Sequence, residues 1–412
     1  MKRGWILIAL LGISLGVAGQ TLAELEQMAL SAPQVRVAEQ EVDVRLAEAA
    51  QTSRWGNLQV AGSAFASPIQ TRTGRQVANF SLMQPLPWLG EQRAKQASAM
   101  GQVSVAQVEV SLSRTGQVYQ VRLSWLDLFD WQQTLKARQA KVENLRVWEG
   151  LLEGRYRAGE IPLSEVVALQ TQLRMAEGRL SLWKLEENPL KAQLEQVVGK
   201  SLPNFTMPDS LSKVSTALGP GAVWEETLWF QKGAEERKAL EAEEQVVLWH
   251  NRPQLSVGTQ YGIIVPYAEG PEVDNGRDIW MLPQLKVSVP VSFQATKQEL
   301  KALEARQLQV SSSYEAQEWA WKTQWAQVRE IYQQGAVQMQ EAVALLQLLD
   351  QQQQLLTAAL QQDQGAAVSL LQVEEARIEA RLQYQLGLTA QWRASWFAEY
   401  LLAGSSQEGG EK

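Results

Sequence analysis

Residues that could carry out chemistry are few in this chain. Its 412 residues include one histidine, His250, and no cysteine. The lack of cysteine excludes a disulfide framework, a thiol nucleophile and a thiolate metal site. The sequence has no glycine-rich phosphate loop, no triad containing histidine and no spaced set of metal ligands, and its Asp and Glu residues are scattered over helical segments. We therefore expect a protein that is not an enzyme, with no catalytic residues, no cofactor and no metal.

Composition and charge narrow the class further. The net charge of −7 and the pI near 5.2 argue against nucleic-acid binding, which normally needs a basic surface. Gln, Ala, Leu and Glu are abundant, as is typical of long exposed helices. The length would allow two or three ordinary domains, but no linker or change of composition divides the chain.

The N-terminus predicts export from the cytoplasm. Lys2 and Arg3 precede an apolar run at residues 5–17, and the small residues Ala18 and Gly19 follow it. This is the pattern of a signal peptide, which we expect to span residues 1–19. A retained anchor is the alternative, although the run is short for a bilayer crossing. No later stretch of 18 apolar residues occurs, so only strands could carry the mature chain across a membrane.

The chain repeats one arrangement of elements with a period near 200 residues. Pro87 and Pro290 each precede a long proline-free run, and Gly159 and Gly365 interrupt those runs at matching places. Such a period indicates duplication of half the architecture. We expect a first repeat at 20–203, a connecting, equatorial segment at 204–223, a second repeat at 224–403 and a disordered tail at 404–412.

The proline-free runs predict long helices with narrow apolar seams. About 70 helical residues would extend roughly 100 Å, more than a compact domain can hold. Apolar residues recur at spacings of three, four and seven, which is the spacing of a coiled-coil seam. The seam residues are Val118, Val121, Trp125, Leu128 and Leu135 in the first half, and Tyr314, Trp321, Trp325, Val328 and Tyr332 in the second.

Each long run is predicted to end in a helical hairpin. Gly159 marks a helix end, Pro162 lies near the next start, and Ser164 is placed to cap it. Gly365 and Ser369 repeat this arrangement. The return arms are expected at about 165–198 and 368–403. A surface turn in a helical bundle would explain either hairpin taken alone.

Four segments alternate between apolar and other residues with a period of two. They lie at about 57–67, 76–87, 254–266 and 279–292, with loops at 68–75 and 266–278. Such segments are typical of transmembrane barrel strands. Trp55, Trp88 and Trp249 flank them where strands join helices, as expected of side chains at a membrane interface. Core packing at the strand–helix junction is the alternative interpretation of these three rings.

Four strands cannot close a barrel, because about eight are needed for even a narrow one. An open edge in lipid would leave backbone groups unpaired. The strands therefore predict an oligomer, and three copies would supply twelve strands.

In this order and spacing the motifs resemble the TolC-like outer membrane efflux family over nearly the whole mature chain. They are Gln84-Pro-Leu-Pro-Trp-Leu-Gly with Arg93 and Lys95, Val289-Pro-Val with Lys297 and Lys301, Tyr156-Arg-Ala-Gly159 with Ser164 to Gln170, and Gly365 with Ser369 to Arg381. The resemblance implies a mainly α fold with transmembrane β structure: long hairpins form a periplasmic helical barrel, and four strands per protomer build a twelve-stranded barrel in a trimer.

The resemblance also implies partners and a place in the cell. It predicts a passive homotrimeric duct in the outer membrane of a Gram-negative bacterium, in contact with outer-membrane lipid and extending into the periplasm. A periplasmic adaptor (membrane fusion) protein and an inner-membrane pump of the RND or ABC type would complete a tripartite efflux or type I secretion system. The adaptor would dock on the hairpin tips at Arg157, Gly159, Glu160, Pro162, Ser164, Gln364, Gly365 and Ser369.

The family's acidic aperture positions fall on Ser369 and Gln372, so this chain departs from a charged gate there. Glu374 and Glu375 are the candidates to supply negative charge instead, although ordinary exposed helix residues would look the same. The chain also lacks the lipid-modified cysteine of many relatives. A periplasmic coiled-coil scaffold without a barrel is the alternative function. The transported substrate and the pump class are not encoded in recognisable residues, and neighbouring genes would identify the system.

Overall fold

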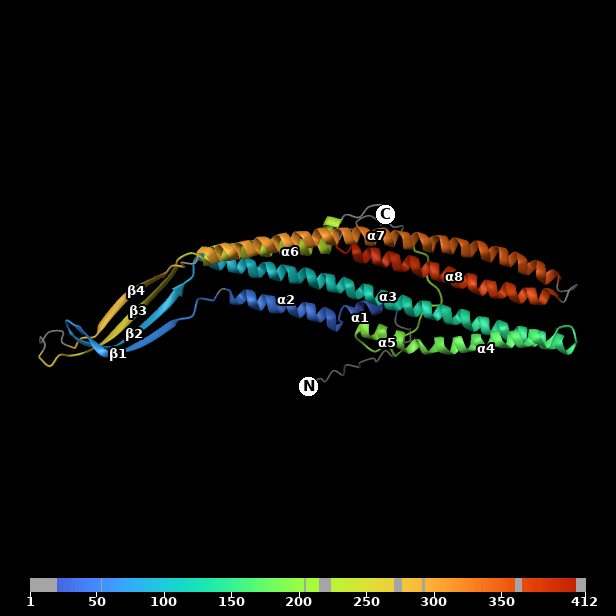
Figure 1. Ribbon diagram of the computed structural model, residues 1–412, viewed down its shortest axis with the longest axis horizontal. Coiled ribbons are helices and arrows are strands. Elements are labelled where there is room, and N and C mark those ends of the chain that lie inside the picture. Colours follow the sequence, from blue (N-terminus) through green and yellow to red (C-terminus); the bar gives the residue numbers. More distant parts are fainter. Residues whose placement is uncertain are drawn as a thin grey trace, which may run out of the picture. The chain divides into compact units, whose positions relative to one another are not determined.

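A computed structural model (Figure 1) describes residues 21–52, 54–203, 205–214, 224–269, 276–290, 293–359 and 365–404. The predicted signal peptide, Gln364 and residues 405–412 lie outside this part. The helices are α1 (Leu22–Ala29), α2 (Pro33–Gln51), α3 (Leu89–Arg157), α4 (Leu163–Leu185), α5 (Glu187–Val198), a 3-10 helix η1 (Trp224–Glu226), α6 (Leu228–His250), α7 (Phe293–Ala359) and α8 (Gly365–Leu401). The strands are β1 (Gln59–Thr71), β2 (Gly74–Leu86), β3 (Gln254–Val265) and β4 (Ile279–Ser288).

The chain divides into two compact units, and each draws on both halves of the sequence. The first contains Met1–Arg36, Leu112–Val223 and Ala320–Lys412, and the second contains Val37–Ser111 and Trp224–Trp319. All four strands belong to the second unit, and both helical hairpins turn within the first. The expected mainly α fold with four strands is therefore confirmed.

The four strands form one antiparallel sheet in the order β1-β2-β3-β4. The strand prediction was right in number and wrong in extent. β1 continues through Pro68 to Thr71, and Gly74 (φ +142°) follows a short turn, so the loop predicted at 68–75 is mostly strand. Proline is tolerated there because the pairing of β1 with β2 is irregular between Ala64 and Ile69. β4 ends at Ser288, four residues before the predicted end.

The core of the helical unit is rich in aromatic side chains. Trp125 and Phe129 of α3 stack with ring centroids 5.8 Å apart, and Trp396 of α8 meets Trp125 edge-on. Leu25 of α1 and Leu194 of α5 are buried against them. The predicted seam residues Val121, Trp125 and Leu128 belong to this cluster, and Trp321, Trp325 and Val328 of α7 are also buried.

The α3–α4 hairpin turns at Gly159, as predicted. Gly159 adopts φ +75°, its N–H donates to the Tyr156 carbonyl, and the Glu160 N–H donates to the Arg155 carbonyl. These two bonds form a Schellman motif, which satisfies carbonyls that the helix end would leave free.

Three details of the hairpin prediction were wrong. Pro162, not Ser164, is the N-cap residue of α4, and no side chain caps the helix. The first return arm is two helices, because Pro189 lacks an N–H and its ring disfavours a helical turn at the carbonyl of Leu185, where α4 ends. Gly365 is the first residue of α8 and does not terminate α7, which ends at Ala359.

The α7–α8 hairpin depends on two small residues that face each other. A Cβ on Gly335 would lie 2.7 Å from the Gly387 carbonyl oxygen, and a Cβ on Gly387 would lie 2.9 Å from the Gly335 carbonyl oxygen. Since real Cβ atoms do not approach oxygen so closely, the two backbones can touch only because both side chains are hydrogen. Gln338 also donates to Gln383 across this helix pair at 2.5 Å.

Candidate functional site

The sheet has two chemically different faces. The register places one row of side chains opposite another from β1 to β4, for example Gly62, Phe80, Tyr261 and Trp280. Rows of this kind alternate between the faces. The apolar face carries Val60, Phe80, Leu82, Val257, Thr259, Tyr261, Trp280, Leu285 and Val287. The opposite face carries mainly polar residues, Gln59, Ser63, Asn79, Ser81, Ser256, Gln260, Gln284 and Lys286, interrupted by Met83, Ile279 and Met281.

Large apolar side chains on the apolar face are exposed in the single chain. Val60 is 71% exposed, Trp280 68% and Leu285 67%. Trp280 meets Tyr261 edge-on with centroids 6.1 Å apart, and its indole N–H donates to the Thr259 hydroxyl at 2.6 Å. The indole N–H of Trp280 thus has its hydrogen-bond acceptor within the sheet, and the exposed surface of this face is mainly hydrocarbon. A contiguous apolar face of this kind marks a surface that contacts a membrane or another protein.

The edges of the sheet are open in the single chain. Within the described residues β1 pairs only with β2, and β4 pairs only with β3. The outer N–H and C=O groups of β1 and β4 therefore have no strand partner in the described chain. An exposed edge of this length favours pairing with another chain.

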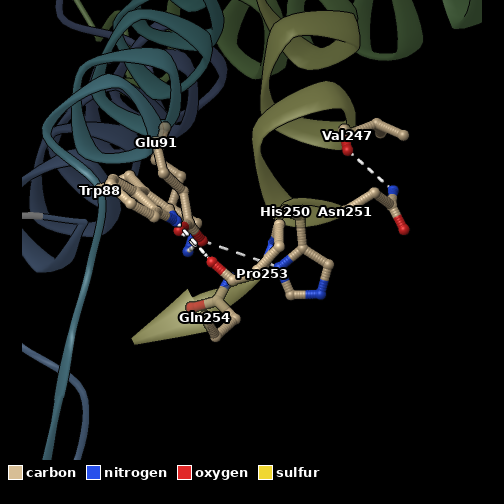
Figure 2. Close-up of polar contacts among 8 residues, drawn as sticks. Trp88, Glu91, Val247, His250, Asn251, Pro253 and Gln254 are labelled. Carbon is tan, nitrogen blue, oxygen red and sulfur yellow. Dashed lines mark hydrogen bonds and ion pairs between the residues drawn. The ribbon is translucent and has the colours of Figure 1, made fainter. Parts of the chain in front are cut away.

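The three predicted interface tryptophans lie where strands join helices, and each has a different environment. Trp55 is 64% exposed, whereas the indole N–H of Trp88 donates to the Pro253 carbonyl at 2.8 Å (Figure 2). Trp249 is half-buried, lies against Gly90, and carries the Arg252 guanidinium 3.8 Å from its ring centroid. Trp88, which is 40% exposed, and Trp249 thus both make contacts at the strand–helix junction.

A nearly buried carboxylate joins the start of α3 to the α6–β3 connection. Glu91 is 3% exposed, and its Oε1 accepts from Lys95 Nζ at 2.7 Å. Gln254 Nε2 lies 3.5 Å from Oε2, and Nδ1 of His250 lies 3.7 Å from Oε1 (Figure 2). Burial alone would raise the pKa of Glu91, but the hydrogen bonds and positive charge around it outweigh burial and lower that pKa.

Replacing Glu91 with Gln is expected to lower the free energy of unfolding by about 1–3 kcal/mol at neutral pH, because Lys95 and Gln254 lose a charged acceptor. The folded-state pKa of Glu91 lies below its ordinary value of 4.5. Its contribution is therefore complete above about pH 4.5 and is lost as the pH falls through the folded-state pKa. Thermal unfolding midpoints measured between pH 3 and 7 should converge for Glu91→Gln and wild type at the acid end. Exposed Glu299→Gln is the control, and equal effects of the two changes would contradict this role.

The predicted tip residues of the α3–α4 hairpin lie together. Arg157 is paired with Glu153 at 3.4 Å, and Glu160 with Arg155 at 3.1 Å. Gly159, Pro162 and Ser164 surround them at the exposed turn. Of the second tip, Gln364 lies outside the described residues, while Gly365 and Ser369 lie in the first turns of α8.

The four aperture candidates occupy consecutive turns of α8, but both carboxylates have partners. Glu374 pairs with Arg377 at 3.0 Å, and Glu375 pairs with Lys141 of α3. Gln372 is exposed, and Ser369 is half-buried. Glu374 and Glu375 are therefore ion-pair partners within the chain, and neither is a free negative charge.

No group of three or more His, Cys, Asp or Glu side chains among the described residues could hold a metal ion. No helix in that same part of the chain is long and apolar enough to cross a membrane.

Solved structures with a similar fold include outer-membrane proteins. VceC of Vibrio cholerae is 16% identical, with 93% of this chain and 96% of that chain covered and a TM-score of 0.70. The MtrE channel of Neisseria gonorrhoeae is 12% identical, with 95% of this chain and 91% of that chain covered and a TM-score of 0.71. CusC, whose folding and transmembrane channel formation involve conformational changes, is also similar. It is 16% identical, with 94% of this chain and 93% of that chain covered and a TM-score of 0.75. The chain has the fold of these membrane proteins. Comparison with protein-family models and with curated proteins finds no match.

Within this channel fold, the structure reveals contacts between hairpins that the sequence did not indicate. Besides the Lys141–Glu375 pair, Asn144 of α3 donates to the Leu371 carbonyl of α8 at 3.0 Å. Arg377, 16% exposed, also contacts Asp350 of α7 at 3.1 Å. α8 is thus held by polar contacts to α3 on one side and to α7 on the other. Sequence spacing could not reveal these pairs, since Lys141 and Glu375 are more than 200 residues apart.

Proposed function

We propose that this chain is one protomer of a homotrimeric outer-membrane channel, a passive duct of a tripartite efflux or type I secretion system. The observation that carries the proposal is the sheet: one face is apolar, the other is mainly polar, and both edges are open. A membrane barrel built from several chains needs such a sheet. Its apolar face contacts lipid, its polar face lines a water-filled lumen, and its open edges pair with the neighbouring chains.

Three copies are the smallest assembly that pairs every strand edge and leaves a lumen wide enough for a substrate to pass. One sheet of four strands cannot close, and twelve strands enclose a lumen wider than that of a filled eight-stranded barrel. Joining β4 of one copy to β1 of the next would pair every edge, as lipid requires. The fold shared with outer-membrane channels supports this assembly.

The helices would continue the duct into the periplasm. A periplasmic adaptor would dock on the hairpin tips around Arg157, Gly159 and Glu160, and an inner-membrane pump would supply the energy. The exposed charges of the first tip support a protein partner that exchanges polar contacts at small net cost.

A periplasmic scaffold without a barrel fits the helices but not the sheet. A soluble scaffold would leave Val60, Trp280 and Leu285 in water, at roughly 1.5–3 kcal/mol for each large apolar side chain. The apolar face therefore favours the channel.

Purified full-length protein tests the proposal. We expect detergent-dependent trimers from the outer-membrane fraction that shift in mobility on heating and give ion-conducting pores in planar bilayers. A water-soluble monomer that produces no conductance would overturn the proposal.

Loosening α8 from α3 is expected to open the periplasmic end. Lys141→Glu replaces an attraction to Glu375 by a repulsion, at about 0.5–1 kcal/mol per copy for an exposed pair, so the three copies together should raise the mean conductance several-fold. Single-channel recording measures this. The charge swap Lys141→Glu with Glu375→Lys is the matched control and should restore the low value. Equal conductance of all three proteins would show that this pair does not hold the channel closed.

A further inference from the structure

The segments that connect the sheet to the helices carry an excess of positive charge. The chain passes between them four times, and each passage has an exposed basic residue: Arg54 before β1, Arg93 after β2, Arg252 before β3 and Lys297 after β4. We call these four residues the junction belt. It belongs to a chain whose net charge is −7, so it is a local reversal of the overall sign.

The belt charges are not neutralised by the protein. None of the four side chains forms an ion pair with a carboxylate among the described residues. The acidic residue closest in sequence to Arg93 is Glu91, which is 3% exposed and already binds Lys95. Four cations that have no ion-pair partner in the described chain, each near a passage between the sheet and the helices, leave room for an anionic partner.

Arg252 is the belt residue whose geometry is best defined. Its guanidinium lies 3.8 Å from the ring centroid of Trp249, and its side chain is exposed. Stacking on an aromatic ring fixes the plane of the guanidinium and leaves the N–H groups at its edge free to donate. A planar fork of donors fits the oxygens of a phosphate group in a bidentate manner.

The belt lies where the apolar face ends. Leu86, Leu255 and Val287 share the last apolar row. Arg252 lies three residues before Leu255, Arg93 lies seven residues after Leu86 in the first turns of α3, and Lys297 lies ten residues after Val287 in the first turns of α7. At the opposite end of the sheet the exposed charged residues are of both signs: Arg72, Arg75, Arg277, Glu269 and Asp278. In a membrane, the boundary of the hydrocarbon is the level of the lipid phosphates.

We propose that the junction belt binds the headgroups of anionic phospholipids, with Arg252 on Trp249 as its best-ordered site. The inference rests on the proposed function, because it needs the apolar face to lie in lipid. The occupant is a lipid surface whose negative charge exceeds that of zwitterionic headgroups. Each Lys or Arg near such a surface adds to the attraction.

Binding of short-chain phosphatidylglycerol to the detergent-purified full-length protein, measured by native mass spectrometry, tests the proposal. Wild type should prefer phosphatidylglycerol to phosphatidylcholine of the same chain length, and Arg93→Gln with Arg252→Gln should weaken phosphatidylglycerol binding about tenfold. The matched control, Arg72→Gln with Arg75→Gln, removes the same charge from the other end of the sheet and should bind like wild type.

Three results would overturn the belt: equal weakening in both double variants, no preference for phosphatidylglycerol in wild type, or inorganic phosphate competing at the same concentration as the lipid. The last would indicate an anion site independent of lipid. Conductance of the same proteins in planar bilayers separates the two proposals. If every variant conducts but the wild type shows no preference for phosphatidylglycerol, only the proposal that the belt binds lipid is contradicted. Wild-type protein that forms no pores contradicts the proposed channel function.

Discussion

Phe80→Arg is expected to abolish assembly in the membrane. Phe80 lies near the middle of β2, on the apolar face, with its ring over Gly62 of β1. An arginine on the lipid face near the bilayer midplane costs about 2–4 kcal/mol, and a trimer would carry three. The heat-modifiable trimer and the pores in planar bilayers that we expect of the wild type should both be absent.

Two companion variants identify the cause of that loss. Ser63→Arg places the same side chain at nearly the same level of the sheet but on the polar face, where the proposed lumen would solvate it, and it should assemble. Phe80→Leu keeps the apolar surface and should also assemble. If Ser63→Arg fails as completely as Phe80→Arg, the two faces are not lipid and lumen.

Gly335→Ala is expected to destabilise the α7–α8 hairpin, although alanine favours a helix more than glycine does. The new methyl group would lie 2.7 Å from the Gly387 carbonyl oxygen, so the helices must separate, at a cost of about 1–3 kcal/mol. Thermal unfolding followed by helical circular dichroism should show a lower midpoint than wild type.

The opposite sign is expected at a glycine with free space around it. A Cβ on Gly150 of α3 meets no atom within 4 Å, so Gly150→Ala should gain the helix propensity of alanine, about 0.5–1 kcal/mol. A midpoint for Gly335→Ala at or above that of Gly150→Ala would show that the close contact of the helices does not limit stability.

Local alternation was enough to predict the strands and the composition of their faces. In β3 the alternation from Leu255 to Val265 assigns each side chain to one face, and the register agrees with that assignment. It failed at Pro68, because a proline usually ends a strand and only the irregular pairing at the edge of the sheet makes it acceptable. The turn at Gly159 could be predicted for the same local reason, since a positive φ favours glycine.

Contacts between distant residues could not be predicted in this way. Gly335 and Gly387 look like helix-weakening residues in the sequence, and only their apposition shows why they are useful. Glu91 reads as an ordinary first-turn acid of α3, yet Gln254 and His250 approach it from a segment more than 150 residues away. The ion pairs of Glu375 with Lys141 and of Glu374 with Arg377 could not be predicted from the sequence either.

The two open strand edges have a genetic consequence. In the proposed closed ring every subunit pairs with both neighbours, so a copy with one damaged edge would disrupt any ring that it joins. If three subunits mix at random in a cell that produces equal amounts of intact and damaged subunits, only roughly one ring in eight would contain three intact subunits. Edge-strand mutations in β1 or β4 should therefore be dominant over the wild-type gene, whereas changes that merely unfold the chain before assembly should be recessive.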